Sequence, residues 1–288
     1  MVIGAAWDGP RAPVAGAGKH PPGERTAAAR AAEVLWHELE CGCYRADLPL
    51  WRELADREGG PILDIGAGTG RVSTVLADAG HEVVAVDVDE TLLGALEERA
   101  TAVKVQAVCT DARALALGRR EFGLCIVPMQ TIQLLGGRPG RLAFLRAARE
   151  HLRPGGVLAC AIAAALEPFD CARGDPPPIP DSMRIGDVLY VSRPTRVQIH
   201  GDRVLIERER LLVALATDAR GTDRAPDRAD GSPPGPVQAV ERSVIELDRL
   251  SPAQLRREAI EVGLRPEPTR QIPASEEHTG SAVVMLRA

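Results

Sequence analysis

The stretch that decides the fold reads ILDIGAGTGR and occupies residues 62–71. Its apolar start predicts a short buried strand, and a helical segment over 71–79 follows the glycines. Glycines let a chain turn tightly and approach a ligand without a Cβ atom, while the first turn of a helix presents unpaired N–H groups. The stretch therefore predicts a strand–turn–helix unit whose turn binds a carboxylate or a phosphate.

The spacing of the glycines discriminates between ligand classes. A dinucleotide-binding turn has the pattern G-x-G-x-x-G, whereas here Gly70 comes one position early and Arg71 stands where the third glycine is expected. This spacing disfavours a nicotinamide cofactor. No Lys-Ser/Thr pair follows the glycines, so a triphosphate-binding loop is excluded.

Two acids follow the next two predicted strands. Asp87 ends the strand predicted over 82–87, where a carboxylate can accept hydrogen bonds from both hydroxyls of a ribose. Asp111 follows the strand predicted over 103–109 and is placed to accept from the exocyclic amine of adenine. The alternative for Asp111 is a helix N-cap, a position that aspartate favours.

Strands and helices alternate through the first part of the chain. Helices are expected over 24–40 and 48–58, before the first strand, and again over 91–100 and 142–152. Further strands are expected over 124–127 and 157–163. Such an alternation implies an α/β fold with a parallel sheet and right-handed crossovers.

The pattern changes after residue 165. Alternating β-branched runs over 188–192, 196–200, 204–213 and 237–247 predict antiparallel strands, with a polar stretch over 217–236 between the last two. Ser251 and Pro252 then start a helix, and strands over 265–272 and 282–286 close the chain. We expect a disordered tail at 1–23, a ligand-binding domain built from 24–165 with 248–288, and an antiparallel insertion over 166–247.

At this point the chain resembles the class I S-adenosylmethionine-dependent methyltransferases, over roughly residues 33–163 and the final strand pair. In that family the turn matching DIGAGTG holds the methionine part of the cofactor, and the acids matching Asp87 and Asp111 contact ribose and adenine. The resemblance implies a Rossmann-like, seven-stranded, mostly parallel sheet, S-adenosylmethionine as cofactor and no obligatory metal. The residues expected at the cofactor are Tyr44, Asp64, Gly66, Ala67, Gly68, Gly70, Asp87, Val88, Asp111, Ala112, Met129 and Gln130.

The insertion resembles the substrate cover of small-molecule members of this family, including actinobacterial sugar and natural-product methyltransferases. We expect its strands to contribute substrate contacts or a homodimer interface. The chain reads VPMQ over 127–130, after the fourth strand, where nucleic-acid members have N-P-P-Y or D-P-P-Y, so base methylation is not expected. The implied function is methyl transfer to an O or N nucleophile of a small molecule. A cofactor-binding protein that does not methylate and, less favoured, a nicotinamide-dependent dehydrogenase are the alternatives.

Several polar or aromatic residues have both a functional and a structural interpretation. Tyr44 is expected either over the cofactor or buried in a helix interface, and Gln130 at a ligand or bonded to loop backbone, with Gln133 less certain. Arg71 is expected to reach the cofactor carboxylate or to be solvated. His278, between the two final strands, is the candidate general base, with a solvated loop as its alternative. Nothing distinguishes the four histidines at helix ends or the surface, His37, His81, His151 and His200.

Composition narrows the class of partner. A net charge of -5 and a pI near 5.8 provide no basic face for nucleic acid, and no apolar run approaches the roughly 20 residues that span a bilayer. A cytoplasmic protein with a small-molecule partner is expected. The six cysteines match no common zinc spacing, and Cys109, Cys125 and Cys160 lie in apolar runs that predict buried thiols.

Overall fold

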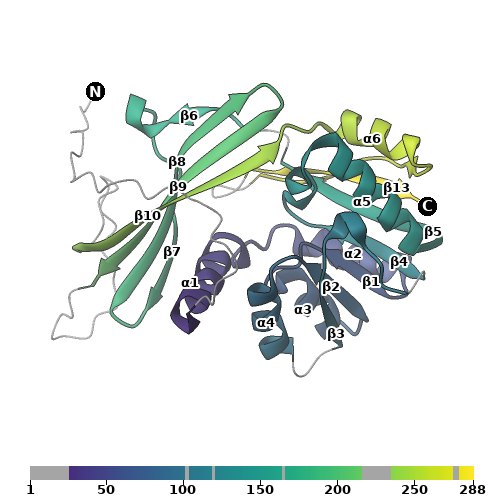
Figure 1. Cartoon of the computed structure of the whole chain (residues 1–288), viewed down its shortest axis with the longest axis horizontal. Helices are drawn as coiled ribbons and strands as arrows, with labels where there is room; N and C mark the ends of the chain where they lie inside the picture. Colours follow the sequence, from purple (N-terminus) through teal and green to yellow (C-terminus); the bar gives the residue numbers. More distant parts are fainter. Residues whose placement is uncertain (1–25, 101–103, 119–120, 164–165, 216–234, 275–278) are drawn as a thin grey trace.

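The structure is a computed structural model that describes residues 26–100, 104–118, 121–163, 166–215, 235–274 and 279–288. The predicted tail at 1–23, most of the polar stretch over 217–236 and His278 lie outside these ranges. The described chain forms an α/β body with a separate antiparallel sheet beside it (Figure 1). The fold class predicted from the sequence is confirmed.

The central sheet has the order β11-β13-β5-β4-β1-β2-β3, with β12 also paired to β13. Its five parallel strands are β1 (Ile62–Ile65), β2 (Val83–Asp87), β3 (Val105–Cys109), β4 (Phe122–Val127) and β5 (Leu152–Ile162). β13 (Ser281–Arg287) runs antiparallel to β5. Because the parallel strands share one direction, their carboxyl ends meet at one edge, next to the glycine turn.

Helices cover both faces of this sheet. α5 (Gly137–His151) and α6 (Pro252–Glu261) pack on one face, and α2 (Leu48–Glu58) and α3 (Arg71–Asp78) pack on the other. α4 (Glu90–Arg99) packs beside β2 and β3. Every residue of β4 is buried, as expected of a central strand with helices on both sides.

The cysteine prediction holds at two of three positions. Cys125 and Cys160 are fully buried, and burial raises the pKa of both thiols. The prediction for Cys109 is wrong because β3 is the edge strand of the sheet and its last side chain is exposed. The buried pair behaves as small hydrophobic side chains.

Two elements differ from the sequence prediction, and a Pro residue explains each difference. The strand expected over 265–272 is broken into β11 (Arg265–Pro266) and β12 (Arg270–Ile272), which makes eight strands rather than seven. Pro268 between them has no N–H to donate to a ladder. α5 begins five residues before the expected start at 142, since Pro139 lies in its first turn, where N–H groups have no helical partner.

The second sheet has the order β10-β9-β8-β6, with β7 also paired to β8. Its strands are β6 (Phe169–Asp170), β7 (Asp181–Ile185), β8 (Val188–His200), β9 (Arg203–Ala214) and β10 (Val237–Asp248). The two strands expected over 188–192 and 196–200 are one, because the irregularity at Pro194 is a bulge in the pairing with β9 and not a turn. We call this sheet the cover.

A buried ionic cluster joins the cover to the α/β body. Asp248, the last residue of β10, accepts from Arg141 of α5 at 2.6 Å, from Arg203 of β9 at 2.7 Å and from the Gly137 N–H at 2.7 Å. Glu258 of α6 also accepts from Arg141, at 2.7 and 2.8 Å. Both acids and Arg141 are nearly fully buried, so the cluster fixes one end of the cover to the body.

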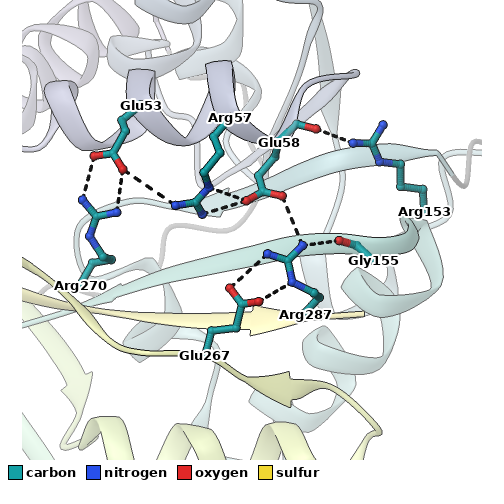
Figure 2. Close-up of polar contacts among 8 residues, drawn as sticks. All are labelled: Glu53, Arg57, Glu58, Arg153, Gly155, Glu267, Arg270 and Arg287. Carbon is teal, nitrogen blue, oxygen red and sulfur yellow. Dashed lines mark hydrogen bonds and ion pairs between the residues drawn. The ribbon is translucent and has the colours of Figure 1, made fainter.

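A second ionic network joins α2 to the C-terminal strands (Figure 2). Arg287 of β13 donates to Glu58 at 3.3 Å, to Glu267 and to the carbonyl of Gly155 at 2.6 Å. Arg270 forms a bidentate pair with Glu53 at 2.7 and 2.8 Å. These pairs hold α2 against the last strands of the chain.

Candidate functional site

The glycine turn runs from the end of β1 into α3 and is bonded to β2. The N–H groups of Gly66 and Ala67 donate to the carbonyl of Val86 at 2.8 and 3.1 Å, and Gly70 N–H donates to Ala67 at 2.9 Å. Ala67 is buried. The turn therefore has a fixed conformation at the carboxyl edge of the sheet.

All three glycines of the turn, Gly66, Gly68 and Gly70, have positive φ and face side chains at close range. Gly68 has φ of 55°, and a Cβ there would lie 2.5 Å from the His37 ring. Gly66 has φ of 71°, and a Cβ there would lie 2.5 Å from Thr131. The bare backbone expected of this turn is thus required by its geometry, and it brings His37 and Thr131 into the site.

No local sequence pattern marks His37 or Thr131 as a residue of this site. His37 ends α1 (Ala27–His37) and lies 3.3 Å from the Thr69 hydroxyl through Nδ1. Burial lowers the pKa of His37, with Glu38 and Asp87 opposing the shift. Only the packing of α1 across the turn separates His37 from the other histidines, and no local pattern reveals that packing.

Asp87 supports the turn directly. Its Oδ2 accepts from the Gly68 N–H at 2.8 Å and its Oδ1 from the Asp89 N–H at 3.0 Å. A carboxylate offers about four lone-pair positions, so each oxygen retains capacity for a ligand hydroxyl. The predicted ribose contact stays a proposal, and the position of Asp87 beside the turn is compatible with it.

Asp64, the third residue of β1, is an unusual carboxylate. It is 1% exposed, and its Oδ2 accepts from the Ser73 hydroxyl at 2.6 Å. Its Oδ1 is buried and has no hydrogen-bond partner within the described ranges. Burial raises the pKa of Asp64 to about 6. A buried oxygen without a donor is costly, and a cationic group bound nearby would offset that cost.

Asp111 has the capping contact that was its alternative interpretation. It accepts from the backbone N–H of Arg113 at 2.8 Å at the start of the short 3-10 helix Ala112–Ala114, and it pairs with the Arg113 guanidinium at 2.6 Å. The hydrogen bond from the Arg113 guanidinium lowers the pKa of Asp111. The neighbouring Thr110 N–H donates to the backbone carbonyl of Asp87 at 2.9 Å, so the two acids lie at adjacent strand ends. Val88, which follows Asp87 in the chain, is 69% exposed.

The segment after β4 has strained backbone. Met129 has φ of 55°, the one positive value among the described residues other than glycine. Such strain clusters at ligand sites, where the surrounding structure maintains it. Gln130 precedes the short helix Thr131–Leu134 and makes no capping bond. Gln133 is buried, donates to the Asp248 carbonyl at 3.0 Å and accepts from Ala163 N–H at 2.9 Å, so its role is structural.

Arg71 is not solvated, contrary to one of its two interpretations, and its contact with the cofactor carboxylate stays a prediction. Its guanidinium is buried, forms a bidentate pair with Asp47 at 2.6 and 2.7 Å and donates to the Tyr44 carbonyl at 2.8 Å. It also lies 5.2 Å from the centre of the Tyr44 ring. Asp47 also accepts from the Trp51 indole N–H at 2.8 Å, so the pair of Arg71 and Asp47 is part of a buried network. Tyr44 is buried in this interface, its predicted alternative.

Together these residues fit the adenosyl and methionine parts of the expected cofactor. The turn has no room for additional side-chain atoms, Asp87 supports it, and Asp64 has a buried, unpaired carboxylate oxygen in the strand that enters it. His37 lies over Gly68, beside the backbone that a ligand of the turn would approach. His278 lies outside the described residues, and its predicted role as base remains a prediction.

Comparisons with known proteins agree with this geometry. Residues 62–156 match the methyltransferase domain family. Over 100 residues the chain is 37% identical to the cypemycin N-terminal methyltransferase of a Streptomyces species, a match that takes in 35% of this chain and 40% of that enzyme. The chain therefore matches less than half the length of this relative.

Two solved structures share the fold over nearly the whole chain. SAM-bound CalS10, an amino pentose methyltransferase from Micromonospora echinaspora, has a TM-score of 0.62 at 18% identity, over 93% of this chain and 100% of CalS10. The sugar N-methyltransferase KedS8 from a Streptoalloteichus species has a TM-score of 0.64 at 16% identity, over 96% and 100%. At these identities the likeness shows the fold alone.

The chain thus carries a methyltransferase domain, and the class predicted from the glycine turn is confirmed for that domain. No helix in the described ranges is long and apolar enough to cross a membrane. Nor do three or more His, Cys, Asp or Glu side chains there form a group that could hold a metal ion.

Proposed function

We propose that the protein binds S-adenosylmethionine at the glycine turn and transfers its methyl group to a nitrogen of a small natural-product or sugar-like molecule. The observation that carries the proposal is the turn itself. Its close-packed glycines, the supporting Asp87 and the unpaired Oδ1 of Asp64 lie at one edge of the sheet. The match of residues 62–156 to methyltransferase domains supports the same cofactor.

Each contact of the cofactor is assigned to a described residue. Asp87 accepts from the ribose hydroxyls, and Asp111 with Ala112 lines the adenine position. Gly66, Ala67, Gly68 and Gly70 hold the methionine part, with Asp64 balancing its positive charge. Tyr44, Val88, Met129 and Gln130 complete the proposed set. When bound, S-adenosylmethionine supplies an electrophilic methyl group, so the protein has to align and desolvate the acceptor.

The relatives support nitrogen rather than oxygen as the acceptor atom. The cypemycin enzyme acts at a peptide N-terminus by its name, KedS8 is a sugar N-methyltransferase, and CalS10 acts on an amino pentose. An amine nitrogen needs a free lone pair aimed at the methyl carbon at about 3 Å, and it releases one proton. We keep His278 as the proposed acceptor of that proton, on the sequence argument alone.

The cover is the proposed source of acceptor contacts. Phe169, Ile199 and Ile206 form a partly buried apolar strip beside the buried Val197, Val204 and Leu247, near the end joined to the body. A strip of this kind suits the aliphatic or ring carbons of a small molecule better than a charged polymer. A homodimer through the cover remains an expectation from the sequence.

The proposal is tested by product analysis with the purified full chain and S-adenosylmethionine carrying a deuterated methyl group. The substrates are a panel of amino sugars and short peptides with free N-termini, each matched with its hydroxy or N-acetyl analogue. The expected result is transfer of one deuterated methyl group to amines and not to the blocked analogues. Asp87→Ala is the matched variant and should lower the yield.

Methylation of the hydroxy analogues with the amines unchanged would contradict the choice of nitrogen. Binding of S-adenosylmethionine by calorimetry, without methylation of any panel member or of cell extracts, would favour the non-methylating alternative.

A further inference from the structure

A short turn at the end of α1 contacts both the glycine turn and the cover. Residues Glu38–Gly42 form a single π-helical turn, a conformation that is rare and often found at functional sites. In Figure 1, α1 lies between the antiparallel sheet and α4. We call this segment, with His37, the bridging turn.

One side of the bridging turn contacts the cofactor site. The His37 ring lies over Gly68, where a Cβ would come within 2.5 Å of it. Glu38 accepts from the Thr69 hydroxyl of the glycine turn and from Arg99 of α4, the latter at 2.7 Å. Any ligand that fills the turn at Gly68 therefore displaces His37 and disturbs its neighbour.

The other side holds the cover through Glu40. Its two carboxylate oxygens accept from Arg210 of β9 at 2.8 and 2.9 Å, and Oε1 also accepts from Ser192 of β8 at 2.7 Å. Arg208 lies 3.9 Å away, and the Arg210 guanidinium also lies 5.4 Å from the Trp36 ring. The Glu40 side chain is 9% exposed, so this contact is an interior one.

The alternation of the two acids follows from helical geometry. Residues two apart in a helix point to opposite sides, so Glu38 and Glu40 contact different bodies. Burial by itself would raise the pKa of Glu40, but hydrogen bonds from Arg210 and Ser192 hold it below its usual value. Glu40 is thus ionised and paired near neutral pH, and its contact to the cover is bidentate and directional.

There is also space for the bridging turn to move. A hollow of about 620 Å³ lies between α1 and α4, lined by Val34, Leu35 and Glu38 on one side and by Gly94 and Glu98 on the other. Close-packed interiors resist displacement, whereas a helix beside a hollow can shift. The end of α1 can therefore move with the ligand and carry Glu40 with it.

We propose that Glu40 is a positioning residue that couples occupancy of the glycine turn to the placement of the cover over it. This inference rests on the proposed binding of S-adenosylmethionine. In it, the ligand shifts His37, the bridging turn follows, and the ion pair with Arg210 transmits the shift to β8 and β9. The cover is thereby aligned for the acceptor only when the methyl donor is present.

The test measures amide hydrogen exchange of β8 and β9 in the full chain with and without S-adenosylmethionine. We expect the ligand to slow exchange there by roughly tenfold in the wild type, within the usual range of coupling between sites. In Glu40→Gln the slowing should fall below roughly twofold while the glycine turn stays protected. The control is Glu241→Gln, because Glu241 meets Arg210 at 3.5 Å from the solvent side and should leave the coupling intact.

A purely structural role for Glu40 would speed exchange equally with and without ligand and would leave the ligand-dependent difference unchanged. That result would overturn the proposal. Arg210→Lys, which keeps the charge but loses the bidentate contact, should give intermediate coupling even if Glu40→Gln proves unstable. Calorimetry on the same samples separates the two claims: bound ligand with an unaffected wild-type cover contradicts only the coupling, whereas absence of binding contradicts the proposed function as well.

Discussion

Replacing Asp64 by asparagine should change how the stability of the protein depends on pH. The folded carboxyl has a pKa of about 6 because it is buried, against 3.8 for an exposed aspartate. Between these values the folded state keeps a proton that the unfolded state has released, so stability falls as pH rises. The resulting loss in the free energy of unfolding is complete above about pH 6 and amounts to about 3 kcal/mol, at 1.36 kcal/mol per unit of pKa.

Asparagine cannot ionise, and its carbonyl can still accept the hydrogen bond from Ser73. Urea unfolding of the wild type and Asp64→Asn should therefore show the variant gaining about 3 kcal/mol relative to the wild type between about pH 4 and pH 8. Any cost of the unpaired amide group changes the free energy of unfolding of the variant by the same amount at every pH. Parallel pH profiles of the two proteins would contradict a raised pKa for Asp64 in the folded state.

The same substitution should weaken binding of a cationic ligand, since the unpaired oxygen of Asp64 is the group that such a ligand stabilises. In the wild type, affinity for S-adenosylmethionine should rise as pH increases through about 6, with release of a proton on binding. In Asp64→Asn this dependence should be absent. Ionised Asp64 is thus expected to lower the stability of the folded protein and to strengthen its binding of the ligand.

Three further variants test other parts of the account. Gly68→Val should weaken binding of S-adenosylmethionine at least about tenfold, because it adds atoms against His37 and strains backbone with positive φ by about 1–3 kcal/mol. Unchanged affinity in calorimetry would count against the turn as the binding site. Asp248→Ala should lower the free energy of unfolding by about 3 kcal/mol, because it leaves buried Arg141 short of a partner. The control, Glu246→Ala, removes an exposed partner of Arg203 and should lower it by less than about 1 kcal/mol. Equal losses of the two variants in urea unfolding would contradict this prediction. His278→Ala should lower turnover with the identified acceptor near neutral pH, and wild-type rates from about pH 6 to 9 would exclude His278 as the base.

The sequence predicts the α/β body because its local patterns agree with the global fold. The glycine turn, the apolar runs of β1, β4 and β5 and the caps of α6 each specify an element without reference to distant parts of the chain. The predicted bounds of helices and strands are wrong where a Pro lies at a position that the element can accommodate. The start of α5, the bulge at Pro194 and the break at Pro268 are cases in which position within the element decides the outcome.

The site is less accessible to sequence reasoning because it is assembled from distant segments. Gly68 and Asp87 stand out by their place after strands, but His37 joins them only through the packing of α1 across the turn. Arg71 likewise finds Asp47, 24 residues earlier in the chain. Glu40 and Arg210 are 170 residues apart, and nothing in either local sequence indicates their ion pair.

The most direct test of the central claim is calorimetric titration of S-adenosylmethionine into the wild type, Asp87→Ala and Asp89→Ala. Asp89 caps α4 through the N–H groups of Thr91 and Leu92, so its loss should cost about 1 kcal/mol of stability and leave affinity unchanged. The account predicts one site per chain in the wild type and a loss of about 1.5–3 kcal/mol in Asp87→Ala, roughly ten- to hundredfold in affinity. No binding to the wild type, or equal affinity in all three proteins, would contradict it.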